Sequence, residues 1–330
     1  MIRKHAPLLA VLALAACSGN PLNFPDPNPP VPPGDGALPG TPTPTPTGPI
    51  SRREARNDQG DGYAESFAYD ATTDRFSVDN LGFDGDNSYT RGVVVGSLGP
   101  FRVYESARAF ADSVTGAPIG QFQHRALLGV SRSGETEFAV VRTGAYVGYG
   151  FGGFTYQRNG AVTLPTTGQA TFAGDYAGIR DFKGIGGLVY TRGTMTMDID
   201  FEDFNEGNAV KGEVINRRLY DINGVDITAA YVAALNTKET TTASALPVLR
   251  FVVGPGVMDA NGEIRGDINS FIAPTGEALK EFESGKYYAV LSGTNPDEVA
   301  GIIVVESEDA RFDGTVTARE TGGFILYRSP

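Results

Sequence analysis

Residues 189–201 read V-Y-T-R-G-T-M-T-M-D-I-D-F, and apolar and polar side chains alternate along them. The apolar residues of this stretch share one parity: Val189, Met195, Met197, Ile199 and Phe201. The other parity, from Tyr190 to Asp200, is mostly polar. An alternation of apolar and polar residues with a period of two is typical of a β-strand, in which successive side chains point to opposite faces. The stretch therefore predicts a half-buried antiparallel β-strand.

Runs of this kind recur about eight times after residue 168, at spacings typical of β-proteins. They lie near residues 170–180, 188–202, 209–220, 247–254, 262–271, 285–293, 299–307 and 321–328. Residues 294–297, T-N-P-D, separate two of the runs and predict a hairpin turn. Eight antiparallel strands can close into an up-and-down barrel whose interior is filled by side chains. We expect this barrel over residues 161–330.

Two short helices are expected as insertions in the barrel. One spans about residues 228–235. The other carries Ala278, Leu279 and Phe282 on one face and ends at Gly285.

Residues 55–160 also read as strands, at about 63–69, 92–96, 101–104, 121–130 and 137–146. A break in the pattern at residues 164–168, L-P-T-T-G, places the domain boundary near residue 160. The predicted fold is therefore all-β, with a small N-terminal β-domain packed on a C-terminal eight-stranded antiparallel barrel. No cysteine follows Cys17, so an apolar core must stabilise both parts without disulfide bonds.

The first 17 residues have the parts of a secretory signal: Arg3 and Lys4, an apolar run over residues 6–14, and small residues before Cys17. The run is much shorter than the roughly 20 apolar residues of a membrane-spanning helix. Residues 14–17, L-A-A-C, resemble the lipobox of bacterial lipoproteins. This resemblance implies that residues 1–16 are removed and that Cys17 becomes an acylated N-terminus, while Ser18 permits sorting to the outer membrane.

A proline-rich stretch follows the expected anchor, up to about residue 54, and includes T-P-T-P-T-P at residues 41–46. Proline lacks an amide donor and favours extended structure, so residues 17–54 are expected to form a disordered spacer. The formal net charge of the whole chain is −12. An anionic surface argues against nucleic acid as a partner and against a flat contact with anionic lipid.

Three stretches of the expected barrel resemble motifs of the transferrin-binding-protein-like bacterial surface lipoproteins. Residues 164–174, L-P-T-T-G-Q-A-T-F-A-G, are similar to the family's entry into the barrel, with Phe172 in place of a tyrosine. Residues 203–212 are similar to its D-F-x-x-G-x-V-x-G hairpin, and residues 312–324 to its closing strand, with Thr315 where proline is usual. The motif residues carried over as structural are Gly168, Gly174, Asp203, Phe204, Gly212, Gly314, Glu320, Gly322 and Gly323.

The resemblance covers residues 161–330 and implies that the preceding β-domain corresponds to the family's handle. Members of the family are surface or outer-membrane lipoproteins that bind a host protein or another ligand. The best-known members have two lobes and capture iron-loaded transferrin, whereas this chain has room for one handle and one barrel. The implied ligand is therefore a protein or a nutrient, with iron- or haem-related ligands among the candidates.

No residue pattern predicts a catalytic, cofactor or metal site. The acidic residues from Asp198 to Glu206 fit the solvent face of a strand and its turn, and residues 84–87, D-G-D-N, lack the glutamate of a calcium loop. Residues 148–153 satisfy G-x-G-x-x-G, but strand rather than helix is expected to follow. His124 is the only histidine after the signal, so it could serve as a haem ligand or a single catalytic base, or it could be a surface or packing residue.

Three functions remain open: a surface lipoprotein that binds a protein or nutrient ligand, a structural or adhesion lipoprotein of the envelope, and a hydrolase. We favour the first, because the chain lacks the usual means of activating a nucleophile while an anchor and a spacer provide reach. Ligand contacts are expected on loops at one end of the two β-domains, at residues 223–245 and 273–284. Loops on a rigid scaffold can vary without affecting the core.

Overall fold

The computed structural model describes residues 38–79, 81, 87–107, 113–117, 123–144, 148–202, 209–253 and 257–329. The predicted signal, Cys17 and most of the predicted spacer lie outside these residues, as do Asp203 and Phe204. Among the described residues, no helix combines the length and the apolar character that crossing a membrane requires.

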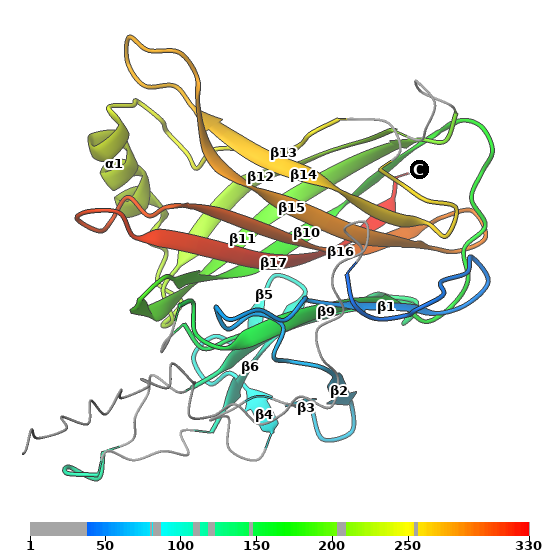
Figure 1. The fold of residues 1–330 in the computed structure, drawn as a ribbon, viewed down its shortest axis with the longest axis horizontal. Helices are drawn as coiled ribbons and strands as arrows, with labels where there is room; N and C mark the ends of the chain where they lie inside the picture. Colours follow the sequence, from blue (N-terminus) through cyan, green and yellow to red (C-terminus); the bar gives the residue numbers. More distant parts are fainter. Residues whose placement is uncertain are drawn as a thin grey trace, which may run out of the picture. The chain divides into compact units, whose positions relative to one another are not determined.

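The N-terminal part is a nine-stranded antiparallel sheet, called the handle sheet here (Figure 1). Its strand order is β1-β9-β8-β7-β6-β4-β3-β2, and β5 pairs with β6. The strands are β1 (Ile50–Arg53), β2 (Phe67–Asp70), β3 (Arg75–Val78), β4 (Ser88–Arg91), β5 (Ser97–Leu98), β6 (Phe101–Ser106), β7 (Arg125–Val130), β8 (Thr136–Arg142) and β9 (Gly152–Arg158).

The handle sheet differs from the sequence-based expectation at three places. Strand β1 pairs with β9, so regular structure begins within the segment predicted as a spacer, before residue 55. Residues 92–96 form a loop and not the predicted strand. Both ends of this loop bond to Val103, which donates to the carbonyl of Gly96 at 3.1 Å and accepts from the amide of Gly92 at 2.9 Å. Strand β2 begins at Phe67 and not near residue 63.

The C-terminal part is a closed antiparallel barrel of eight strands, which confirms the predicted fold class. Strand β17 pairs with both β16 and β10, so the sheet has no free edge where the chain ends. The strands are β10 (Gln169–Phe182), β11 (Ile185–Asp200), β12 (Ala209–Tyr220), β13 (Leu249–Phe251), β14 (Glu263–Ile272), β15 (Lys280–Ser292), β16 (Glu298–Glu308) and β17 (Thr317–Arg328).

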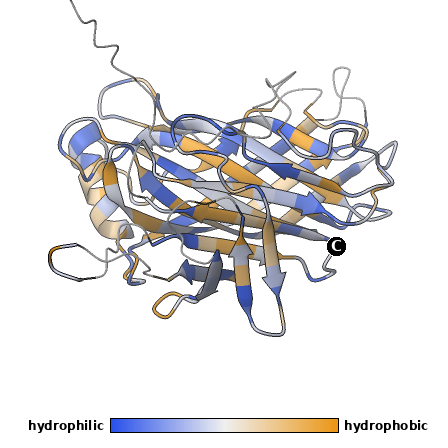
Figure 2. Ribbon diagram, turned by 60° about the horizontal axis from the view of Figure 1, so that its bottom comes forward, coloured by the Kyte–Doolittle hydropathy of each residue, from blue (hydrophilic) through white to orange (hydrophobic). Residues whose placement is uncertain are grey.

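Alternation along the strands fills the barrel interior. Met195, Met197 and Ile199 of β11 point inward and are at most 1% exposed, as their parity predicts. The rings of Phe251 and Tyr287 stack inside the barrel with centroids 3.5 Å apart. Figure 2 shows the corresponding mixture of apolar and polar residues along the barrel strands. The barrel is therefore a packed core of side chains.

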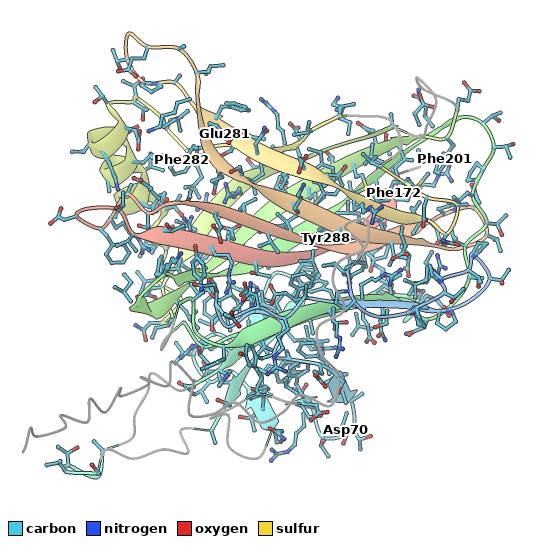
Figure 3. The ribbon with its side chains drawn as sticks, viewed as in Figure 1. Asp70, Phe172, Phe201, Glu281, Phe282 and Tyr288 are labelled. Atoms are coloured by element: carbon cyan, nitrogen blue, oxygen red, sulfur yellow. The ribbon has the colours of Figure 1, made fainter. Side chains whose placement is uncertain are left out.

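Some outward-facing residues of the barrel are also buried, because the handle sheet covers them. Tyr190, Ile179, Val290 and Ile302 belong to a second core cluster shared with strands of the handle sheet. Tyr288 of β15, labelled on the barrel in Figure 3, stacks on Phe154 of β9 with ring centroids 6.2 Å apart. Burial on both faces explains why residues 299–305 of β16 and 322–327 of β17 are continuous runs of apolar residues and glycine that do not alternate with polar ones.

One helix is present in the described part of the chain, and one predicted helix is wrong. Helix α1 (Thr228–Glu239) confirms and extends the helix expected at 228–235. The second predicted helix does not form: Ala278 and Leu279 lie in a loop, and Phe282 lies in strand β15 (Figure 3). Its residues have helical spacing, but pairing with β14 extends β15 back to Lys280. Tertiary hydrogen bonds override the local pattern here.

Candidate binding surfaces

A buried network of charges lies inside the barrel beneath α1. Arg217 donates to both carboxylate oxygens of Glu283, at 2.7 and 2.8 Å, and to Glu320 at 3.0 Å. Glu320 also accepts from the hydroxyls of Tyr176 at 2.6 Å and Thr191 at 2.9 Å. These carboxylates bond to the protein's own side chains, so the network stabilises the barrel wall rather than presenting a reactive group.

The motif residues around Glu320 make room for aromatic rings. A Cβ at Gly322 would lie 2.4 Å from the ring of Tyr176 inside the barrel, and a Cβ at Gly323 would lie 2.1 Å from the ring of Phe138 in the handle sheet. Gly212 is similarly placed against the ring of Phe251. Gly174 packs against the backbone of β17, while Gly168 and Gly314 have positive φ at turns. These motif residues therefore occupy positions where a side chain would clash or the backbone would be strained.

Charged residues also fasten the handle sheet to the barrel. Arg142 of β8 donates to both oxygens of Glu54, at 2.9 and 2.7 Å, and to the hydroxyl of Thr321 on β17 at 2.9 Å. Its Nε lies 3.8 Å from Asp181 of β10, which accepts from Arg319 of β17 at 2.7 Å. Burial raises the pKa of Glu54, but the charge and hydrogen bonds of Arg142 outweigh burial and hold this pKa below its usual value.

The first loop predicted to bind a ligand, residues 223–245, mainly closes the barrel. Tyr231 and Leu235 of α1 are fully buried, and Tyr231 packs with Phe182, Leu219 and neighbouring residues at the barrel end. The hydroxyl of Tyr231 accepts a hydrogen bond of 3.3 Å from Arg180. The second predicted loop lies beside the first, since the amide of Thr275 donates to the carbonyl of Thr240 at 2.8 Å. The two loops therefore lie together, but α1 belongs to the core.

Exposed apolar residues gather where the β12–α1 turn lies against the handle sheet. We call Val93, Val94, Ile222 and Val225 the apolar loop patch; they are 92%, 63%, 38% and 57% exposed. Val95 is buried in the core between the two sheets, and a Cβ at Gly224 would lie 3.3 Å from it. The two loops that carry the patch are thus in contact.

Local hydrogen bonds fix the turn that carries Ile222 and Val225. The carboxylate of Asp221 accepts from the amides of Asn223 at 2.8 Å and Val225 at 2.9 Å, and Gly224 has a φ of +78°. A carboxylate that caps its own turn in this way holds the backbone in one conformation. The apolar side chains are therefore presented outward by a rigid turn and not by a chain that could collapse onto the core.

The other candidate site residues from the sequence analysis pack or form hydrogen bonds within the fold. His124 is fully buried in the handle sheet beside Tyr89, with ring centroids 6.4 Å apart, which suits packing and leaves no access for haem. Asp198 and Asp200 lie on the outer face of the barrel and accept from Thr171 and Gln169. Residues 154–157 continue as strand β9 after the glycine-rich segment, as expected. Among the described residues, no three His, Cys, Asp or Glu side chains are grouped as metal ligands.

Comparison with known proteins finds similarity only to solved structures. No protein-family model and no curated protein matches the sequence. A transferrin-binding protein B (TbpB) double mutant from Haemophilus parasuis is 11% identical, with a TM-score of 0.37 over 84% of this chain and 45% of that one. Intact Ap-TbpB, with its N and C lobes, is 12% identical, with a TM-score of 0.35 over 85% of this chain and 46% of that one.

A structure described as a surface lipoprotein is 13% identical, with a TM-score of 0.30 over 61% of this chain and 80% of that one. The chain spans less than half the length of the TbpB structures. At these scores the likenesses carry no argument about ligand or activity, which must come from the surfaces described above.

Proposed function

We propose that the protein is a non-catalytic lipoprotein of the outer membrane, anchored through Cys17, that binds a protein partner at the apolar loop patch. The observation that carries the proposal is the exposure of Val93, Val94, Ile222 and Val225 on two loops in contact. Single exposed apolar residues are normal, whereas grouped ones are typical of protein interaction sites. Burying such residues against a partner is favourable, because apolar surface leaves water.

The chemistry of the barrel supports a binding rather than a catalytic role. Glu283 and Glu320 are hydrogen-bonded to Arg217 and to hydroxyls inside a packed interior. A general acid or base must reach a substrate proton, and these buried groups do not face a site of that kind. The proposed anchor and spacer would hold the patch away from the membrane, where a macromolecular partner can approach it.

A comparison of four serine substitutions with a matched control tests this proposal. Purified mature protein is immobilised and exposed to envelope proteins of the same bacterium and to proteins from its surroundings. The patch variant carries Val93→Ser, Val94→Ser, Ile222→Ser and Val225→Ser. The control carries Val252→Ser and Val253→Ser, which are also exposed but lie in the β13–β14 loop. Circular dichroism melting verifies that each variant is folded.

We expect a partner that the unmodified protein and the control capture and the patch variant does not. Equal capture by the patch variant would place the binding site elsewhere on the molecule. Failure of the unmodified protein to retain any partner specifically would contradict the binding function and would favour a structural envelope lipoprotein.

A further inference from the structure

Three asparagines of the chain are followed directly by glycine: Asn159, Asn223 and Asn261. At such a pair the amide nitrogen of the glycine can attack the carbonyl carbon of the asparagine side chain, because glycine has no Cβ to obstruct the approach. The nitrogen gives up its proton, a ring closes, and ammonia leaves. One water molecule then opens the ring to aspartate or isoaspartate. The fold decides which of the three pairs can react in this way.

Two of the three glycine amides are engaged in hydrogen bonds. The amide of Gly224 donates to the carbonyl of Asp221 at 3.0 Å. In the same way, the amide of Gly262 donates to the carbonyl of Asp259 at 3.1 Å. The side-chain amides of the two preceding asparagines donate to the carboxylates of the same aspartates, at 3.4 and 3.0 Å. Attack requires the glycine nitrogen to leave its acceptor, which slows the reaction at both pairs.

The third pair, Asn159 and Gly160, lies just after β9 and is bonded differently. Within the residues that the structure describes, the amide of Gly160 donates to no acceptor. The side-chain oxygen of Asn159 accepts from the side chain of Gln157 at 3.1 Å. A donor at this oxygen stabilises the negative charge that develops on it during the attack. The attacking nitrogen is therefore free, and the carbonyl that it attacks is polarised.

Exposure alone does not distinguish these sites, since the side chains of Asn159 and Asn223 are both exposed. From the difference in hydrogen bonding we infer that Asn159 is a site of spontaneous deamidation in the folded protein, whereas Asn223 and Asn261 are protected. Water is the only co-reactant. The inference does not depend on the apolar loop patch.

The reaction changes the main chain beside a buried arginine. Arg158 is fully buried, and its guanidinium donates five hydrogen bonds to backbone carbonyls. One acceptor is Gly160, at 2.9 Å, and two others are Thr45 and Gly48, at 3.1 and 3.0 Å. An isoaspartate at position 159 adds a methylene group to the main chain between Arg158 and Gly160. Deamidation therefore loosens the attachment of residues 45–48, which precede β1.

Peptide mapping by mass spectrometry tests the inference on the full mature lipoprotein in detergent, incubated at neutral pH for several weeks. All three pairs are measured in the same sample. A parallel incubation in concentrated urea removes the fold, so that only the local sequence acts. The site variant is Asn159→Gln, because a glutamine would have to close a larger ring and reacts much more slowly. Asn223→Gln is the matched control at the other exposed asparagine.

We expect Asn159 to react at least about ten-fold faster than either other asparagine in the folded protein, and the three rates to become similar in urea. Equal rates in the folded protein, or the same ranking in urea, would overturn the inference.

Hydrogen exchange tests the effect on residues 45–48. The amide of Val162 donates to the carbonyl of Pro46 at 2.7 Å. This amide should exchange faster in aged protein and in the aged Asn223→Gln control, but not in aged Asn159→Gln. Unchanged exchange in aged protein would overturn the link between deamidation and the Arg158 contacts.

Discussion

Arg52 of β1 and Glu263 of β14 form a two-pronged ion pair between the handle sheet and the barrel, with N–O distances of 2.5 and 2.6 Å. Their side chains are 8% and 16% exposed. Arg52 also donates to the carbonyl of Thr41 at 2.8 Å, which fixes the chain that precedes β1. The pair thus ties the end of the predicted spacer to the barrel.

Removing one partner of this pair should loosen β1. We expect Glu263→Gln to lower the free energy of unfolding by about 1–3 kcal/mol, because charge-assisted hydrogen bonds to Arg52 are lost. Urea unfolding and amide hydrogen exchange at residues 50–53 measure the effect. The control is Arg53→Gln on the same strand, because Arg53 lies 3.8 Å from Glu65 and both side chains are about a third exposed. Such a surface ion pair contributes little to the free energy of unfolding. Equal losses in both variants would contradict the special role of Arg52.

Replacing either glycine in the middle of β17 with a larger residue should destabilise the barrel. Gly323→Ala places a methyl group against the ring of Phe138, and Gly322→Ala places one against Tyr176. We expect each substitution to cost about 1–3 kcal/mol of stability through overpacking. Gly186→Ala is a control, since its Cβ would meet only a carbonyl oxygen at 3.7 Å. Thermal melting checks the series, and Phe138→Leu should partly restore Gly323→Ala. A neutral Gly323→Ala would contradict the packing account.

Sequence patterns predicted which apolar residues lie inside the barrel but did not predict its buried charged residues. Strand parity correctly placed Met195, Met197 and Ile199 inside the barrel, and the barrel itself followed from repeated alternation. Arg217 was not predicted as buried, because the register of β12 against β11 shifts beside it and Asn216 has a φ of +54°. A bulge reverses the parity of the residues after it. Glu283 shares the inward parity of Tyr287, but the wrongly predicted second helix concealed it.

The candidate surfaces were less predictable than the fold, because they depend on contacts between distant segments. Val93 and Ile222 are apolar residues of two separate loops, which come together where Gly224 lies against Val95. The opposite error occurred at residues 223–245. The sequence analysis predicted an insertion with a helix at 228–235 that contacts ligand and could be replaced without affecting the core, whereas α1 closes the barrel end.

This correction reverses an expectation about stability. If residues 223–245 were a free loop, replacing them with a short Gly-Ser turn would leave unfolding nearly unchanged. Because Tyr231 is fully buried and bonds to Arg180, we instead expect Tyr231→Ala alone to cost about 3–5 kcal/mol. Ala230→Ser, at an exposed neighbouring position, is the control. Unfolding by urea compares the two variants. A Tyr231→Ala variant as stable as its control would restore the free-loop interpretation.

Acid should weaken the β2–β4 region of the handle sheet through Asp74. Hydrogen bonds from Arg91, assisted by the hydroxyl of Tyr104, lower the pKa of this carboxyl to about 2 and outweigh the opposing effect of burial. A carboxyl whose pKa is lower in the folded state stabilises the fold above its unfolded pKa of 3.8 and loses that contribution as the pH falls towards 2. The Asp74→Asn variant should lack this part of the pH dependence.

Unfolding midpoints measured between pH 5 and pH 2 check the effect of Asp74. The control is Asp79→Asn, which removes a carboxylate at the other end of β3, whereas Arg91 pairs with Asp74. Parallel curves for the unmodified protein and Asp74→Asn would contradict the assignment.

The last prediction concerns the anchor. If the resemblance of residues 14–17 to a lipobox reflects processing, Cys17→Ser should abolish acylation and cleavage after Ala16 and move the protein out of the detergent-soluble outer-membrane fraction. Several acyl chains on one residue bind a membrane stably, whereas the charged folded part gives no comparable attachment to anionic lipid. Mass spectrometry of the N-terminal peptide and membrane fractionation measure the result, with Ser18→Ala as a control that keeps the cysteine. A Cys17→Ser variant that remained in the membrane with unchanged mobility would show that the protein is held there by another means.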